Sequence, residues 1–85
     1  MTPDPVIDAR GLLCPLPVLR LRKRLQALAP GSRVVLLATD PAAAIDVPHF
    51  CAQSGHRLLA SHPQAEGATA FTVERGPACA MKAGV

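Results

Sequence analysis

Aromatic residues are nearly absent from this 85-residue chain, which has two Phe and neither Trp nor Tyr. Surfaces that bind single-stranded nucleic acid stack the bases on aromatic side chains, so despite a net charge of +3 we expect no direct nucleic-acid binding. The core must instead be built from Leu, Val, Ile and Ala, which a hydrophobic content of 49% allows. The basic balance favours a surface that docks other proteins.

Long apolar runs and paired cysteines are also missing. No stretch approaches the run of about 20 apolar residues that a membrane-spanning helix needs, and the start MTPDPVIDAR lacks a charged segment followed by an apolar one. The three cysteines, at positions 14, 51 and 79, are an odd number without CxxC spacing. We therefore expect a cytoplasmic protein with free thiols and no association with a membrane.

The length allows one small domain. A chain of 85 residues buries roughly 60 to 65% of its unfolded surface, which is enough for one core. We expect a single domain over residues 1–85, with the core at about 6–75 and a loose tail at 76–85. A second catalytic domain is excluded, and we expect no cofactor.

The apolar patterns predict the order β-α-β-α-β-β. Strands are expected over 5–9, 32–39, 56–62 and 68–75, and helices over 15–29 and from about 41 to 55. Two helices that return between strands should cover one face of a mixed four-stranded sheet, an α/β (α+β) fold with the 32–39 strand at the centre. The first helix should bury one stripe, formed by Val18, Leu21, Leu25 and Leu28.

The second helix carries two candidate N-terminal caps. Asp40 can cap the short PAAAI turn, and Asp46 can cap a second start that leads to Gly55. The helix is therefore predicted to start twice. Caps are a better explanation of both carboxylates than a role as general acids or bases.

The segment RGLLCPLPVLRLRKRL (10–25) places Cys14 where a loop becomes a helix. We expect Cys14 at the N-cap, with Pro15 at the first helical position. Cysteine is a poor N-cap, so a functional thiol explains this position better than a structural one. The helix N-terminus alone would lower the pKa of the thiol modestly, and Arg10 is the nearest cation in sequence that could lower it further.

Several short motifs occur together at spacings that match one known family. They are Asp8, Arg10 and Gly11, the block Cys14-Pro15-Leu16-Pro17, Lys23 nine residues after the cysteine, and the series Asp40-Pro41, Asp46, Pro48, Phe50-Cys51 and Gly55-His56. A CPxP block alone is a weak signal, but these spaced matches over about residues 6–75 are together a strong one. The chain resembles the TusA family of sulfur carriers, also called SirA-like proteins.

The resemblance implies a two-layer α/β sandwich and a cytoplasmic sulfur-relay protein. Cys14 matches the cysteine on which the family carries sulfane sulfur as a persulfide. Family members receive the sulfur from a cysteine desulfurase or a rhodanese-like protein and pass it to an acceptor cysteine, so this chain would be a sulfurtransferase-type carrier that acts with partner proteins. The pathways served are tRNA thiolation, molybdenum cofactor synthesis and sulfur oxidation. Some members active in tRNA thiolation have an acidic residue between the two prolines, where this chain has Leu16, and this difference favours sulfur oxidation.

The basic side of the first helix is a candidate partner-binding surface. Arg20, Arg22 and Lys23, together with Arg10, would flank Cys14 and attract acidic patches on a donor or an acceptor. The alternative is that these are ordinary solvated helix charges. Lys23 lies about 13 Å from Cys14 along a helix axis, so it would guide docking without touching the sulfur.

The remaining thiols and histidines carry weaker hypotheses. Cys51 fits a buried structural thiol within the second helix better than a second sulfur site. Cys79 falls in the expected tail, where its exposure would be incidental, and the alternative is a resolving thiol. His49, Cys51 and His56 do not form a set of four ligands, so we expect no metal site.

A second function from another class is compatible with the same residues. The chain would then be a non-catalytic adaptor that binds a partner through its first helix and uses Cys14 only as a redox-sensing thiol. Such a sensor would react with peroxide but transfer no sulfur.

Overall fold

The computed structural model describes residues 4–77 of the chain, which alternate between strands and helices. The elements are β1 (Val6–Ala9), α1 (Leu16–Gln26), β2 (Arg33–Ala38), α2 (Ala43–Ser54), β3 (Arg57–Pro63), the short 3-10 helix η1 (Ala65–Gly67) and β4 (Thr69–Glu74). The predicted order is confirmed, although both helices are shorter than expected. Within residues 4–77, no helix is long and apolar enough to span a bilayer.

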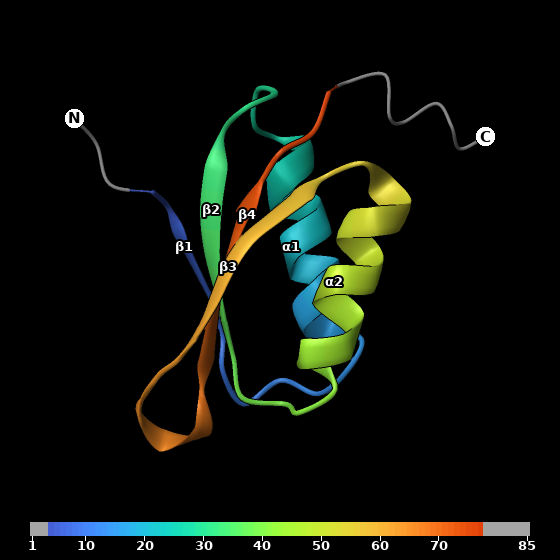
Figure 1. The fold of residues 1–85 in the computed structure, drawn as a ribbon. Helices are drawn as coiled ribbons and strands as arrows, with labels where there is room; N and C mark the ends of the chain where they lie inside the picture. Colours follow the sequence, from blue (N-terminus) through green and yellow to red (C-terminus); the bar gives the residue numbers. More distant parts are fainter. Residues whose placement is uncertain (1–3, 78–85) are drawn as a thin grey trace.

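The four strands form one mixed sheet in the order β1-β2-β4-β3. β1 and β2 are parallel, with Ile7 opposite Leu36, whereas β4 is antiparallel to both of its neighbours. β2 lies in the interior of the sheet, as its continuous apolar run predicts. Both helices cover the same face of the sheet, which gives the expected two-layer α/β sandwich (Figure 1).

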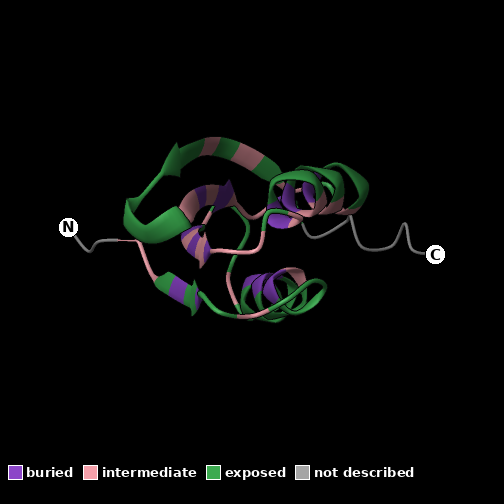
Figure 2. Cartoon of the chain, turned by 90° about the horizontal axis from the view of Figure 1, so that it is seen from below, coloured by how far each residue is buried: buried purple, intermediate pink, exposed green. Residues whose placement is uncertain are grey.

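The core fills the space between the helices and the sheet. Leu21 and Leu25 of α1 and Val47 of α2 are fully buried against sheet residues such as Leu36 and Val73. Figure 2 shows buried positions on the sides of the helices and the sheet that face each other, with exposed positions on the outer sides of the helices. The predicted stripe on α1 is confirmed, because Val18 and Leu28 also pack against this core.

Helix α2 is continuous from Ala43, so the predicted second start at Asp46 is wrong. Asp40 does act as expected, since its Oδ1 accepts the Ala42 N–H at 3.0 Å and stabilises the turn before the helix. Asp46 instead lies within the first turn of α2. Pro48 is tolerated inside the helix because it lies on the exposed side, where water can reach the carbonyl that loses its intrahelical donor.

The end of the described chain is packed against the rest of the protein. The expected loose tail at 76–85 is therefore wrong for Gly76, its first residue. Gly76 is buried, and its N–H donates to His56 Nδ1 at 2.9 Å. Arg75 holds the same segment by donating from Nε to the Leu25 carbonyl oxygen at 2.9 Å, near the C-terminus of α1. Burial and the charge of Arg75 lower the pKa of His56 and keep its ring neutral, so that Nδ1 can accept this hydrogen bond. Cys79 and the rest of the expected tail lie outside the described residues.

Gly76 approaches the Gly55 backbone so closely that a Cβ atom at position 76 would overlap the Gly55 carbonyl oxygen. We therefore expect Gly76→Ala to lower the free energy of unfolding by about 1 to 3 kcal/mol, as overpacking does. Urea unfolding followed by circular dichroism measures this change. Pro77→Ala, at the exposed next residue, is the control and should leave stability unchanged. Equal stability of both variants and the wild type would show that the chain end is not packed against Gly55.

Candidate functional site

The candidate site forms where two loops leave the same end of the sheet. Because β1 and β2 are parallel, the β1–α1 and β2–α2 connections both begin at the carboxyl ends of their strands. The loops lie side by side below the two helices in Figure 1. The Gly11 N–H donates to Thr39 Oγ1 at 2.9 Å and joins the two loops at their start. This arrangement brings the Cys14 segment to the N-terminal turn of α2.

Cys14 is exposed and contacts two carboxylates from the second loop and helix. Its Sγ donates a hydrogen bond to Asp46 Oδ2 at 2.6 Å, and its backbone N–H donates to Asp40 Oδ2 at 2.6 Å. One carboxylate therefore binds the thiol and the other holds the backbone that carries it.

Helix α1 starts one residue later than the sequence predicts. Pro15 occupies the N-cap and Leu16 is the first helical residue, so Cys14 precedes the helix. The Cys14 N–H is bound by Asp40, and the Leu16 N–H donates to the Leu13 carbonyl oxygen at 2.9 Å. Pro15 and Pro17 have no N–H. The backbone donors on either side of Pro15 are thus already bound.

The pKa of the Cys14 thiol is raised, so the expected acidification by the helix N-terminus is wrong. The largest cause is the hydrogen bond to Asp46, followed by partial desolvation and the negative charges of Asp46 and Asp40. A carboxylate that accepts the S–H proton stabilises the thiol, and its charge destabilises a thiolate beside it. The pKa of Asp40 is lowered by the N–H groups of Cys14 and Ala42, so Asp40 remains negative at neutral pH.

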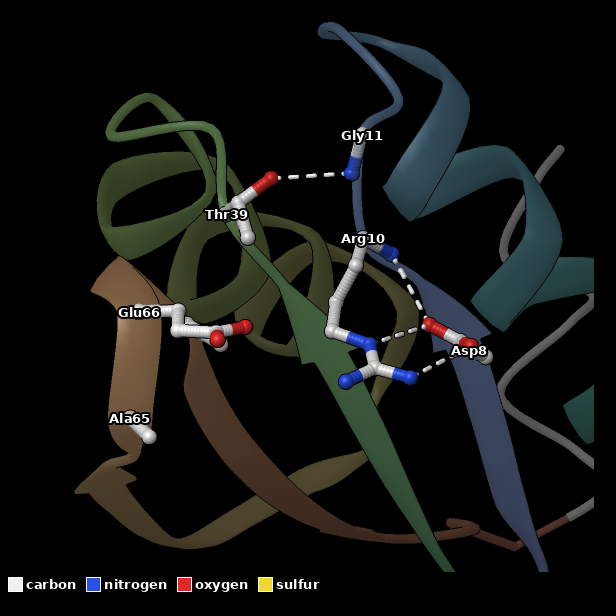
Figure 3. Close-up of a pocket in the computed structure, with 7 residues that line it drawn as sticks. Asp8, Arg10, Gly11, Thr39, Ala65 and Glu66 are labelled. Carbon is white, nitrogen blue, oxygen red and sulfur yellow. Dashed lines mark hydrogen bonds and ion pairs between the residues drawn. The ribbon is translucent and has the colours of Figure 1, made fainter.

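Arg10 binds Asp8 and does not lower the pKa of the Cys14 thiol. Its Nε and Nη2 donate to the two carboxylate oxygens of Asp8 at 2.8 and 2.9 Å. This pairing lowers the pKa of Asp8 to about 2 and raises that of Arg10. Figure 3 shows the pair at one side of an open pocket, with Thr39 and Glu66 at the other side. The charged groups that shift the pKa of Cys14 are the carboxylates, and Arg10 is not among them.

The other predicted partner-binding residues lie along α1. Arg20, Arg22 and Lys23 are exposed, and within residues 4–77 none of them forms an ion pair. The charge of Arg20 makes a small contribution to the lowered pKa of Asp8.

Cys51 has the environment of a structural thiol. It is 2% exposed in the core between α2 and the sheet, and burial raises its pKa to about 11. Within the described chain, no three side chains of His, Cys, Asp or Glu converge as a metal site would require. His56 is instead the acceptor for the Gly76 N–H.

Sequence reasoning missed the partnership of Asp46 and Asp40 with Cys14, because it treated both residues as caps. It also missed a group of exposed apolar side chains on the segments that meet at the thiol. Their exposed fractions are 70% for Leu13, 47% for Leu16, 46% for Leu19 and 74% for Ile45. The parallel pairing of the first two strands is the signal that could have brought the carboxylates to the cysteine.

The fold and the site together define a small α/β protein with an exposed thiol just before its first helix. The profile of the family described as Sulfurtransferase TusA matches residues 6–75. The chain therefore belongs to the TusA family, and this membership supports a role in sulfur transfer.

Individual relatives agree with this assignment. The chain is 44% identical over 69 residues to a sulfur carrier protein TusA of Pseudomonas syringae pv. tomato, which covers 81% of this chain and 80% of the relative. It is 48% identical over 58 residues to a sulfur carrier protein TusA of Pseudomonas putida, with 68% and 72% covered. A solved SirA-like protein from Desulfitobacterium hafniense has the same fold, with a TM-score of 0.75 at 26% identity, and the match covers 84% of this chain and 96% of that one.

The Asp46 carboxylate should slow alkylation of Cys14 by iodoacetamide at about pH 7, because the thiolate is the nucleophile and the carboxylate suppresses it. Asp46→Asn removes the charge but keeps a hydrogen-bond acceptor, so we expect alkylation several-fold faster, with the midpoint of its pH profile moved down. Glu66→Gln is the matched control, because it removes an exposed carboxylate that is not among the charges that raise the pKa of Cys14. Buried Cys51 should stay unmodified in all three proteins. A slower or unchanged rate in Asp46→Asn would contradict the assigned effect of the carboxylate.

Proposed function

We propose that this protein carries sulfane sulfur as a persulfide on Cys14, accepting it from a donor protein and passing it to an acceptor cysteine. The observation that supports this most is the exposed Cys14 thiol within the matched family region, whereas Cys51 is buried. The relatives are named sulfur carrier proteins, and the same role is proposed here.

The proposed chemistry is the transfer of one sulfur atom from a persulfide to a thiol, without net oxidation or reduction. The sulfur of Cys14 attacks the terminal sulfur of a donor persulfide, a new sulfur–sulfur bond forms on Cys14, and the bond to the donor breaks. The donor leaves as a thiol that takes the proton given up by Cys14. The reverse sequence, with an acceptor thiol as the attacking group, unloads the carrier. Neither step requires a cofactor on this chain.

Donor and acceptor are proposed to be proteins that dock over Cys14. A cysteine desulfurase or a rhodanese-like protein is the proposed donor, and the acceptor is a protein with a reactive cysteine. The exposed Leu13, Leu16 and Ile45 supply apolar contact area of the kind found at the centre of protein interfaces. Arg20, Arg22 and Lys23, with Arg10, are proposed to attract acidic patches during the encounter.

The proposed setting is the cytoplasm, in sulfur oxidation or in tRNA or cofactor thiolation. Leu16, which follows Pro15 and is exposed next to the thiol, is the residue that favours sulfur oxidation. The redox-sensor alternative is less well supported, because sensor cysteines react as low-pKa thiolates and the pKa of Cys14 is raised.

Sulfur loading is tested by incubating the protein with a cysteine desulfurase, cysteine and pyridoxal phosphate, followed by intact-protein mass spectrometry. We expect a gain of one sulfur atom, about 32 Da, that is removed by a reducing thiol. Cys14→Ser should abolish this adduct, whereas Cys51→Ala should keep it. An adduct that persists in Cys14→Ser would contradict the proposal.

Docking through the basic side of α1 is tested by charge reversal. Arg20→Glu combined with Lys23→Glu should slow loading by a protein donor at low salt and weaken its dependence on salt, because the encounter loses electrostatic steering. Loading by a small persulfide should not change. Arg33→Glu with Arg57→Glu makes the same change of charge on the strands β2 and β3 and is the control, with its fold checked by circular dichroism because both residues lie opposite Glu74. Equal low-salt rates for the α1 variant and the wild type would show that these side chains are only solvated helix charges.

A further inference from the structure

The contact between Cys14 and Asp46 bears on how firmly sulfur is held. The inference drawn from this contact rests on the proposed function, in which Cys14 alternates between a thiol and a persulfide. Sγ donates its proton to Asp46 Oδ2 at 2.6 Å, and Asp46 occupies the first turn of α2. The helix fixes the backbone of Asp46 beside the thiol.

We propose that Asp46 is the residue that favours release, because it stabilises the empty thiol form of Cys14 and destabilises the loaded persulfide form. The carboxylate touches the reacting sulfur atom, so Asp46 is a catalytic residue of the carrier. Its role is separate from the N-terminal cap that its position in the sequence indicates.

The first part of the argument concerns the hydrogen bond. In the exchange Cys14–SH + R–S–S⁻ → Cys14–S–S⁻ + R–SH, the proton of Cys14 ends on the donor sulfur. The formal oxidation of Cys14 Sγ is balanced by the reduction of the donor sulfur, so no external oxidant is needed. The loaded Sγ is bonded to carbon and to the terminal sulfur and has no proton left to donate. Loading therefore removes the hydrogen bond to Asp46 and leaves that carboxylate oxygen without its partner.

The second part concerns charge. A persulfide is a stronger acid than the parent thiol, so the terminal sulfur is negative at neutral pH. Asp46 and Asp40 both face Cys14, and they raise the energy of a negative sulfur placed there. The favourable position of the terminal sulfur is then the solvent side, away from both carboxylates, where an acceptor thiol can reach it.

The two effects act in the same direction. The thiol form gains a hydrogen bond to a charged acceptor, and the persulfide form meets like charge. The result is a carrier whose sulfur passes readily to the next thiol. Arg10 does not offset the effect, since its guanidinium is paired with Asp8.

The exchange equilibrium with glutathione persulfide and glutathione at a fixed ratio, at about pH 7, measures this property without any partner protein. The persulfide fraction on Cys14 is read by intact-protein mass. We expect Asp46→Asn to retain more sulfur, with the equilibrium constant for loading raised on the order of tenfold. This is the size of effect expected for a hydrogen bond to a charged group that water partly screens. Delivery from the loaded variant to an acceptor thiol should slow accordingly.

Two further variants serve as controls. Glu66→Gln makes the same change of charge elsewhere and should match the wild type, and Asp46→Glu restores a carboxylate and should return the equilibrium toward the wild-type value. Unfolding of Asp46→Asn is monitored by the protection of Cys51 from alkylation. If the folded Asp46→Asn protein holds sulfur no more firmly than the wild type, the inference is overturned while the carrier function stands. If the wild type itself takes up no sulfur, the proposed function fails, and the inference with it.

Discussion

The hydrogen bond between the Cys14 thiol and the Asp46 carboxylate is the interaction on which the site depends. It joins the start of one helix to the first turn of the other, and it exists because β1 and β2 run parallel. Parallel pairing sends both strand–helix connections out at one end of the sheet, so residues 32 positions apart in sequence come into contact. The rest of the sandwich, with Leu21 and Val47 buried between the layers, holds the two helices at the spacing that this contact requires.

A thiol held in its protonated form suits a carrier better than an enzyme whose cysteine must attack a substrate without a partner protein. An acidic cysteine is exposed to alkylation and oxidation whenever it is empty, whereas the Cys14 thiolate is suppressed by the carboxylate beside it. In the proposed function, the partner must then supply the conditions for transfer when it docks, which would couple sulfur movement to recognition. The exposed Leu13 and Ile45 near the thiol are consistent with a surface that is covered only during such encounters.

The order of strands and helices, the buried stripe of α1 and the structural character of Cys51 could all be predicted from hydrophobic spacing, because burial leaves a periodic record in sequence. The Cys14 position could be predicted from the CPLP block. The direction of the pKa shift of Cys14 could not be predicted, because it depends on Asp46. In the sequence, Asp46 was already explained as a helix cap, so nothing indicated a contact with Cys14. The packed Gly76 was also missed, because glycine in a terminal segment indicates a close backbone approach only when the partner, here Gly55, is known.

The central claim is that Asp46 keeps the empty Cys14 in its thiol form. It is tested most directly by nuclear magnetic resonance, following the Cys14 Cβ chemical shift through a pH titration of the reduced protein and of Asp46→Asn. The account predicts a thiol titration above the usual range of about 8.5 in the wild type and at lower pH in the variant. A wild-type titration at or below that range, unchanged by Asp46→Asn, would contradict it.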